Sequence, residues 1–189
     1  MTATPAYGDT RPVFFATLEW VNHLIEQVTE AQLAWPTPDE GWTVADLLKH
    51  VVRVTGMITL PGDAKMPAVP DGATPAQQFA AAAAAARVAW DGPAGTAGLT
   101  EPTRVPPDRT VPKAEALLFF SQEFMVHGWD LATALNLPAE APAPAAQAVL
   151  AYAKATTATT RPAGGPFGPV VEVASDAGTT RQLAAYLGR

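Results

Sequence analysis

The stretch FFSQEFMVHGWDLATAL, residues 119–135, has the composition of an apolar helix with a carboxylate and an imidazole in its middle. Glu123 and His127 are four residues apart, just over one helical turn, so their side chains point the same way. The neighbouring residues are apolar nearly all round, which predicts a central, buried helix. A buried carboxylate needs a partner. Either the two side chains hydrogen-bond to each other, or both bind a metal ion.

The composition limits the class of protein. The chain has 189 residues, 48% of them hydrophobic, which suits one folded domain with one sizeable core. Its net charge of −6 argues against nucleic acid and anionic membranes as partners, since both attract basic surfaces. The N-terminal residues lack a signal-peptide pattern, and no apolar stretch is long enough to span a bilayer. We therefore expect a soluble, cytoplasmic protein.

The sequence contains no cysteine. This excludes disulfides, thiolate zinc sites and a cysteine nucleophile. Any thiol used in a reaction would have to come from an external molecule.

Apolar spacing and capping residues predict four principal helices: one over Pro12–Glu30, one from Thr43 to about residues 56–62, one from Pro75 to about Trp90, and one over Pro112–Asn136. Thr43 with Asp46, and Thr74 with Gln77, have capping-box spacing. The long connection before the last of these helices is expected to hold a short extended piece. The expected fold is mainly all-α, an antiparallel four-helix bundle.

Further elements are predicted after the bundle. They are a fifth helix over Pro144–Thr159, a short strand at VVEV (residues 170–173), and a short final helix over Thr179–Leu187. Thr179 and Gln182 again have capping-box spacing. We expect the tail from about residue 161 to pack across the bundle, so that residues 1–189 form a single domain.

The chain has three histidines, which differ in their surroundings. His23 lies off the apolar stripe of its helix and is predicted to be exposed. His50, in DLLKHVVRV, shares the apolar face of its helix. It is either a bundle-edge histidine that bonds a backbone carbonyl, or a third metal ligand beside Glu123 and His127. Three protein ligands with one open position are typical of catalytic zinc sites, although nickel, iron or manganese would suit these ligands too.

Three segments carry a family resemblance: PTPDEGWTVADLLKHVV (residues 36–52), EFMVHGWDLATAL (residues 123–135) and the ending GPFGPVVEVASDAGTTRQLAAYLGR (residues 165–189). Together they resemble the DinB-like four-helix superfamily. More closely, they are similar to its actinobacterial metal-binding branch, which is related to the N-terminal domain of mycothiol-dependent maleylpyruvate isomerase. The resemblance covers nearly the whole chain.

The resemblance implies a divalent metal, usually zinc, held between the bundle helices by His50, Glu123 and His127. It also implies mycothiol as a co-substrate. Many relatives carry a cysteine where this sequence has Asp39. The isomerase itself has a further C-terminal domain that helps to hold its substrate, and these 189 residues are too short to include one. We therefore do not expect the maleylpyruvate reaction itself.

Two charged residues near the motifs have candidate roles. Asp130, one turn beyond His127, could orient a ligand histidine through its second ring nitrogen, or it could instead face solvent or pin a loop. Arg53, one turn after His50, could attract an anionic substrate or a thiol's carboxylate, or it could lie on a solvated face. Trp42 and Trp129 flank the motifs and are expected to pack in the core or at its rim.

The expected function is that of a divalent-metal-dependent enzyme, a mycothiol-type thiol S-transferase or isomerase that acts on a small electrophilic substrate. One alternative is a metal-dependent cyclase, hydrolase or isomerase of a biosynthetic pathway that uses no thiol. Another is a non-catalytic metal- or ligand-binding stress protein. The oligomeric state stays open, with a homodimer as one option.

Overall fold

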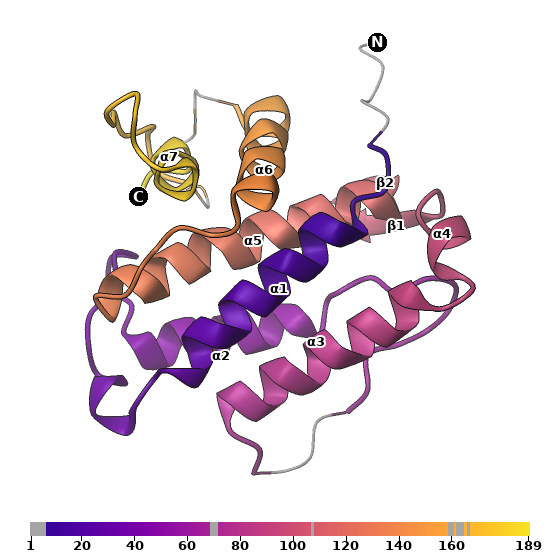
Figure 1. Cartoon of the computed structure of the whole chain (residues 1–189), viewed down its shortest axis with the longest axis horizontal. Helices are drawn as coiled ribbons and strands as arrows, with labels where there is room; N and C mark the ends of the chain where they lie inside the picture. Colours follow the sequence, from indigo (N-terminus) through magenta and orange to yellow (C-terminus); the bar gives the residue numbers. More distant parts are fainter. Residues whose placement is uncertain (1–6, 69–71, 107, 159–160, 162–164, 166) are drawn as a thin grey trace.

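The central element of the molecule is α5 (Lys113–Ala134), the helix predicted over residues 112–136. The computed structural model describes residues 7–68, 72–106, 108–158, 161, 165 and 167–189. Helix α5 is buried nearly all round, as its apolar composition predicts. Figure 1 shows it running through the molecule with other helices on both sides.

Three helices complete a four-helix bundle with α5: α1 (Arg11–Glu26), α2 (Val44–Thr55) and α3 (Pro75–Asp91). Helix α1 packs against α5 and α3, and α2 packs against the same two helices, so the four close into a ring. In Figure 1, α1 and α5 run from right to left, whereas α2 and α3 run from left to right. The predicted mainly helical bundle is confirmed.

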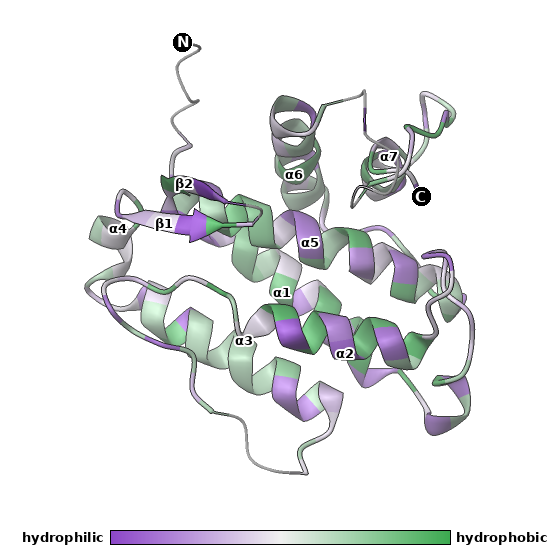
Figure 2. Ribbon diagram, turned by 180° about the vertical axis from the view of Figure 1, so that it is seen from behind, coloured by the Kyte–Doolittle hydropathy of each residue, from purple (hydrophilic) through white to green (hydrophobic). Residues whose placement is uncertain are grey.

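Local signals determine the starts of two of these helices. Thr43 and Asp46 form a reciprocal capping box at the start of α2, as do Thr74 and Gln77 at the start of α3. Helix α2 then turns its apolar residues inward and its charged residues outward, and the alternating green and purple along it in Figure 2 shows this division.

Helix α1 ends earlier than predicted, at Glu26 instead of Glu30. Thr29 is extended and begins a separate 3-10 turn, Glu30–Gln32, in which the Gln32 side chain accepts from the Thr29 backbone N–H at 2.8 Å. This local cap competes with continuation of the helix, and it turns the chain toward the loop that precedes α2.

The long connection between α3 and α5 is more regular than predicted. It contains the short helix α4 (Gly95–Gly98) and an antiparallel pair of strands, β1 (Pro102–Val105) and β2 (Arg109–Pro112). The pairing aligns Thr103 with Val111. The expected extended piece is therefore one arm of a small hairpin that leads into α5.

Two further helices, α6 (Ala143–Thr156) and α7 (Thr179–Tyr186), lie on the side of α5 away from α2 and α3 (Figure 1). They bury a second apolar cluster against α5, which includes Met125, Val126, Ala146, Val149 and Leu183. Both faces of α5 are thus covered. The predicted end of the fifth helix, Thr159, lies outside the described residues; α6 itself ends at Thr156.

Two predictions for the C-terminal segment are wrong. Residues 170–173 form no strand: Val170 and Val171 are exposed, and the Val171 N–H donates to the Ala185 carbonyl at 2.9 Å instead of to a neighbouring strand. The final helix is not capped by Thr179. Instead, the distant carboxylate of Glu140 accepts from the backbone N–H groups of Thr180 at 3.0 Å and Arg181 at 3.2 Å.

Within the described ranges, no helix is sufficiently long and apolar to cross a membrane.

Candidate metal centre

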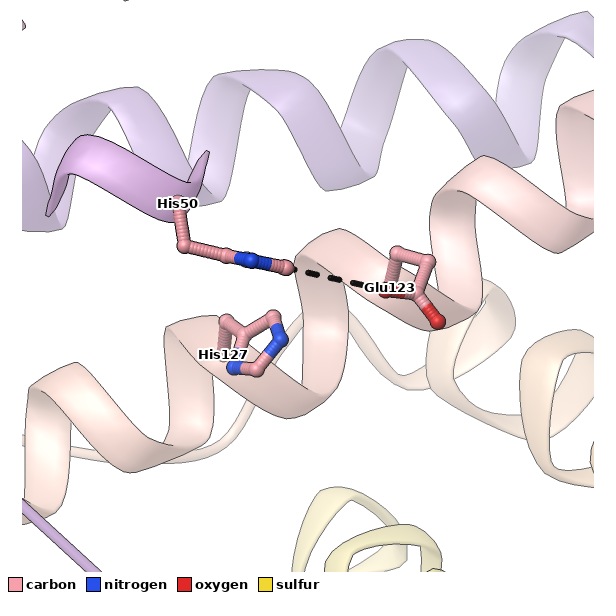
Figure 3. Close-up of side chains that lie close together, drawn as sticks. All are labelled: His50, Glu123 and His127. Carbon is pink, nitrogen blue, oxygen red and sulfur yellow. Dashed lines mark ion pairs between the residues drawn. The ribbon is translucent and has the colours of Figure 1, made fainter. Parts of the chain in front are cut away.

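Packing of α2 on α5 brings His50 together with Glu123 and His127 (Figure 3). One ligand atom from each of the three side chains lies within 4.8 Å of the others. His50 Nε2 is 3.9 Å from Glu123 Oε2, and the rings of His50 and His127 have centroids 4.6 Å apart at an angle of 67°. The three residues chosen from the sequence therefore converge on one point.

The surroundings of these side chains suit a site at the edge of the core. His127 is buried, whereas the side chains of His50 and Glu123 are 17% and 21% exposed. Glu123 thus lies in the wall of a pocket and not deep in the bundle. His23, the third histidine, is exposed on α1, as predicted.

His50 Nε2 is a buried polar atom with no hydrogen-bond partner among the described residues. Such an atom is costly unless something else satisfies it. The carboxylate that faces it, Glu123, is beyond hydrogen-bond distance at 3.9 Å. The backbone-carbonyl alternative for His50 therefore finds no support. The orphaned nitrogen and the donor set of two imidazoles and one carboxylate fit a divalent metal.

Asp130 contacts His127 inside the core. Its Oδ2 lies 3.2 Å from His127 Nδ1, and its side chain is fully buried. A carboxylate can only accept, so this contact assigns the proton to Nδ1 and leaves the lone pair on Nε2. This is the usual arrangement behind a metal-binding histidine.

Arg189 contributes to this site, although no sequence pattern indicated it. Its Nε donates to both Asp130 oxygens at 3.2 Å, and its Nη2 donates to Asp39 Oδ2 at 2.9 Å. A chain of contacts thus runs from His127 through Asp130 and Arg189 to Asp39. No local signal could have revealed it, because Arg189 and Asp39 are 150 positions apart.

Asp39, His127 and Asp130 form a second acidic group whose ligand atoms lie within 4.8 Å of one another. The guanidinium of Arg189 already bonds both carboxylates of that group. Since Arg189 stays charged, it offsets one of the two negative charges and repels a cation. Of the two groups, the one with His50 and Glu123 is therefore the candidate for a metal.

Trp42 lies over both histidines. Its ring is stacked on His127, with centroids 6.0 Å apart and planes 7° apart, and meets His50 edge-on at 5.1 Å. The loop that carries Trp42 is held in place by Thr37, whose N–H donates to the Trp42 carbonyl at 2.9 Å, and by a turn at Gly41, where φ is +81°. Trp42 therefore packs at the rim of the site.

Trp129, the other tryptophan beside the motifs, is buried under the guanidinium of Arg181.

Arg53 contacts a candidate ligand directly. Its Nη2 lies 3.0 Å from His50 Nδ1. A guanidinium only donates, so in this arrangement Nδ1 accepts and Nε2 carries the proton. Ligation of a metal through Nε2 requires the opposite tautomer. We therefore expect metal binding to release Arg53 from His50.

A pocket of about 430 Å³ opens beside His50 and Glu123. Its remaining walls are apolar apart from Arg53, and they come from α2, the β1–β2 connection, α5 and the C-terminal segment: Val54, Met57, Pro106, Phe119, Phe120 and Phe167. Its volume lies in the range of small-molecule sites.

Residues 16–132 match the family described as the mycothiol maleylpyruvate isomerase N-terminal domain. The chain belongs to this family. It is also 32% identical over 169 residues to two Mycobacterium tuberculosis proteins, the uncharacterized protein MT0763 of strain CDC 1551 / Oshkosh and the uncharacterized protein Rv0738 of strain H37Rv. Each alignment covers 88% of this chain and 90% of the relative. No solved structure matches the chain significantly.

The range matched by the mycothiol maleylpyruvate isomerase N-terminal family contains His50, Glu123, His127 and Asp130. Arg189 and Phe167 lie outside it. Residues beyond the family's matched range thus complete the surroundings of the candidate centre.

Proposed function

We propose that His50, Glu123 and His127 bind a divalent metal, with zinc the first candidate, and that the chain is a metal-dependent enzyme using a thiol of the mycothiol type. The observation that carries this proposal is the convergence of three ligand atoms within 4.8 Å, one of them the buried, unpartnered Nε2 of His50. Membership of a mycothiol-related family supports the choice of thiol.

Three protein ligands leave a coordination position for another molecule, as in catalytic zinc sites. A divalent metal in such a position supplies Lewis acidity, which lowers the pKa of a bound thiol or water and polarises a carbonyl. The thiol must come from outside, because the chain has no cysteine. The reaction we propose is addition of that thiol to a small electrophile: an S–C bond forms, the thiol's S–H bond breaks, and the proton passes to the electrophile. In an isomerisation, the reverse of this addition would then release the thiol.

The surrounding residues would keep the ligand side chains in position. Asp130 keeps the His127 ring in one orientation and tautomer, and Arg189 balances the charge of Asp130 in the absence of solvent. Trp42 covers both imidazoles and limits the approach of water. The substrate would then enter from the apolar pocket, whose wall includes His50 and Glu123.

The pocket favours an enzyme or a ligand-binding protein over a purely structural metal site, which needs no adjoining cavity. It does not separate thiol-dependent from thiol-free chemistry. The experiment that does so measures turnover of a panel of small electrophiles by metal-loaded protein, with and without mycothiol. Product that appears only with mycothiol supports the proposal: it carries the thiol's sulfur if the thiol is transferred, and it is a sulfur-free isomer of the substrate if the thiol is released again. Equal turnover without any thiol would replace it with a thiol-free cyclase, hydrolase or isomerase.

A further inference from the structure

Apart from His50 and Glu123, the pocket beside the candidate metal centre has apolar walls and one positively charged side chain. Its apolar surface comes from Val54, Met57, Phe119, Phe120 and Phe167. Met57 is 45% exposed although its side chain is large and apolar. An exposed methionine at the mouth of an apolar hollow is typical of a surface that binds an apolar ligand. The polyol part of a sugar thiol would leave its hydroxyl groups unsatisfied against these walls.

Arg53 is the only positively charged side chain that lines this pocket among the described residues. It lies at the solvent-exposed rim, and its one hydrogen bond to the described part of the chain is to His50 Nδ1. The guanidinium has five N–H donors in a planar fork that matches a carboxylate. Most of its donors therefore remain available to a molecule in the pocket.

The charge balance at this end of the pocket favours an anion. Glu123 offsets Arg53 when no metal is bound. A divalent ion held by His50, Glu123 and His127 would leave Arg53 uncompensated and add positive charge. It would also release Arg53 from His50, because metal binding at His50 Nε2 leaves the ring proton on Nδ1, which then can no longer accept from Arg53. The chain as a whole has a net charge of −6, so the positive charge of Arg53 and the ion, beside apolar low-dielectric walls, would attract a negative group to this end of the pocket.

We propose that this pocket binds the electrophilic substrate, that the substrate is a small carboxylate with an apolar body, and that Arg53 is the residue that selects the carboxylate. The body lies between the phenylalanine rings and Met57. This inference rests on the proposed function for the role of the bound molecule as the electrophile. Without metal, the pocket's preference for an apolar anion rests on its walls and on the free donors of Arg53, and a bound divalent ion would strengthen this preference.

Calorimetric binding of three probes tests the inference: 4-phenylbutanoate, its neutral analogue 4-phenylbutanamide, and acetate, which keeps the charge but lacks the body. The proteins are the wild type, Arg53→Gln and Lys49→Gln, each metal-loaded and chelator-treated. Lys49 is the matched control, because it is an exposed cation on the same helix, does not line the pocket, and forms an ion pair with Asp46 at 3.8 Å.

The expected result is that wild-type protein binds phenylbutanoate at least about tenfold more tightly than either the amide or acetate. Arg53→Gln should abolish the preference over the amide, whereas Lys49→Gln should keep it within about twofold. Equal affinity for acid and amide would overturn the inference. So would an acid preference that survives Arg53→Gln, since the metal alone would then select the charge.

The two proposals fail in different ways. If chelator-treated protein keeps an Arg53-dependent preference but no metal is found in the loaded form, the metal centre fails and the pocket assignment holds. If metal binds as proposed but the probes show no Arg53-dependent preference, the pocket assignment fails and the metal centre stands.

Discussion

The guanidinium of Arg189 lies against the fully buried carboxylate of Asp130, with its Nε 3.2 Å from both carboxylate oxygens. The same carboxylate holds Nδ1 of His127. A residue of the C-terminal segment is thereby connected, through one buried acid, to a candidate metal ligand on α5. The affinity of the metal centre should therefore depend on how the C-terminal segment is docked.

Asp130→Asn should weaken metal binding by about 10–100-fold, as is usual when the partner of a ligand histidine is lost. The amide keeps the size of the side chain but no longer fixes the orientation of His127 by charge. Competition with a chromogenic chelator measures the affinity. Asp91→Asn, a change at a half-exposed acid that pairs only weakly with Arg87, should leave it unchanged. Equal affinity for the wild type and Asp130→Asn would show that Asp130 does not position the ligand.

Arg189→Ala should lower both the metal affinity and the free energy of unfolding. The substitution leaves Asp130 buried without its positive partner, a loss expected to cost about 3–5 kcal/mol of folding free energy for a buried pair. Denaturant unfolding and chelator competition check the two effects. Arg104→Ala, which removes an exposed arginine paired with Asp108, serves as the control and should change stability by less than about 1 kcal/mol. An Arg189→Ala protein with wild-type stability and metal affinity would contradict the linkage.

Gly128→Ala should destabilise the protein, by about 1–3 kcal/mol, although alanine is the better helix former. A Cβ at this position would lie closer to the Trp20 ring on α1 than such atoms approach in folded proteins. This close approach explains the glycine between His127 and Trp129. Gly8→Ala, where a Cβ meets nothing within 4 Å, is the control for the unfolding measurement. A Gly128→Ala variant as stable as the wild type would mean that the Trp20 ring shifts aside at no cost.

Glu101 should make the stability of the hairpin region depend on pH. The hydrogen bond from the Lys113 ammonium at 2.5 Å, aided by the Gly62 backbone N–H, lowers the pKa of Glu101 below its ordinary value of 4.5. A carboxylate with a lowered pKa stabilises the fold above its unfolded-state pKa, and this contribution disappears as the pH falls through the folded value. Glu101→Gln should therefore be less stable than the wild type near neutral pH, and the difference should shrink in acid. A difference that stays constant with pH would argue against the ionic contact.

The local features of the fold could be predicted from sequence, because the groups involved are close along the chain. The capping boxes of Thr43 with Asp46 and Thr74 with Gln77 are of this kind. The pairing of Glu123 with His127 on one helical face follows from periodicity alone. The addition of His50 from another helix needed the family resemblance as well, because spacing within one helix says nothing about its neighbour.

The long-range contacts could not be predicted. Glu140 caps α7 from forty positions away, so the nearer pair Thr179 and Gln182 was a misleading signal. The valines of residues 170–173 have a preference for strands, yet the structure provides no strand beside them. Arg189 is recognised as part of the centre only once the C-terminal segment is seen against Asp130.

The metal centre itself is best tested by elemental analysis of protein purified without a metal-affinity column, carried out on the wild type and on His50→Ala, His127→Ala and His23→Ala. We predict about one divalent ion per chain in the wild type and in His23→Ala, and almost none in the two variants of the site, with the helical circular dichroism retained. Equal metal content in all four proteins, or loss of metal from His23→Ala alone, would contradict the assignment of His50 and His127 as ligands.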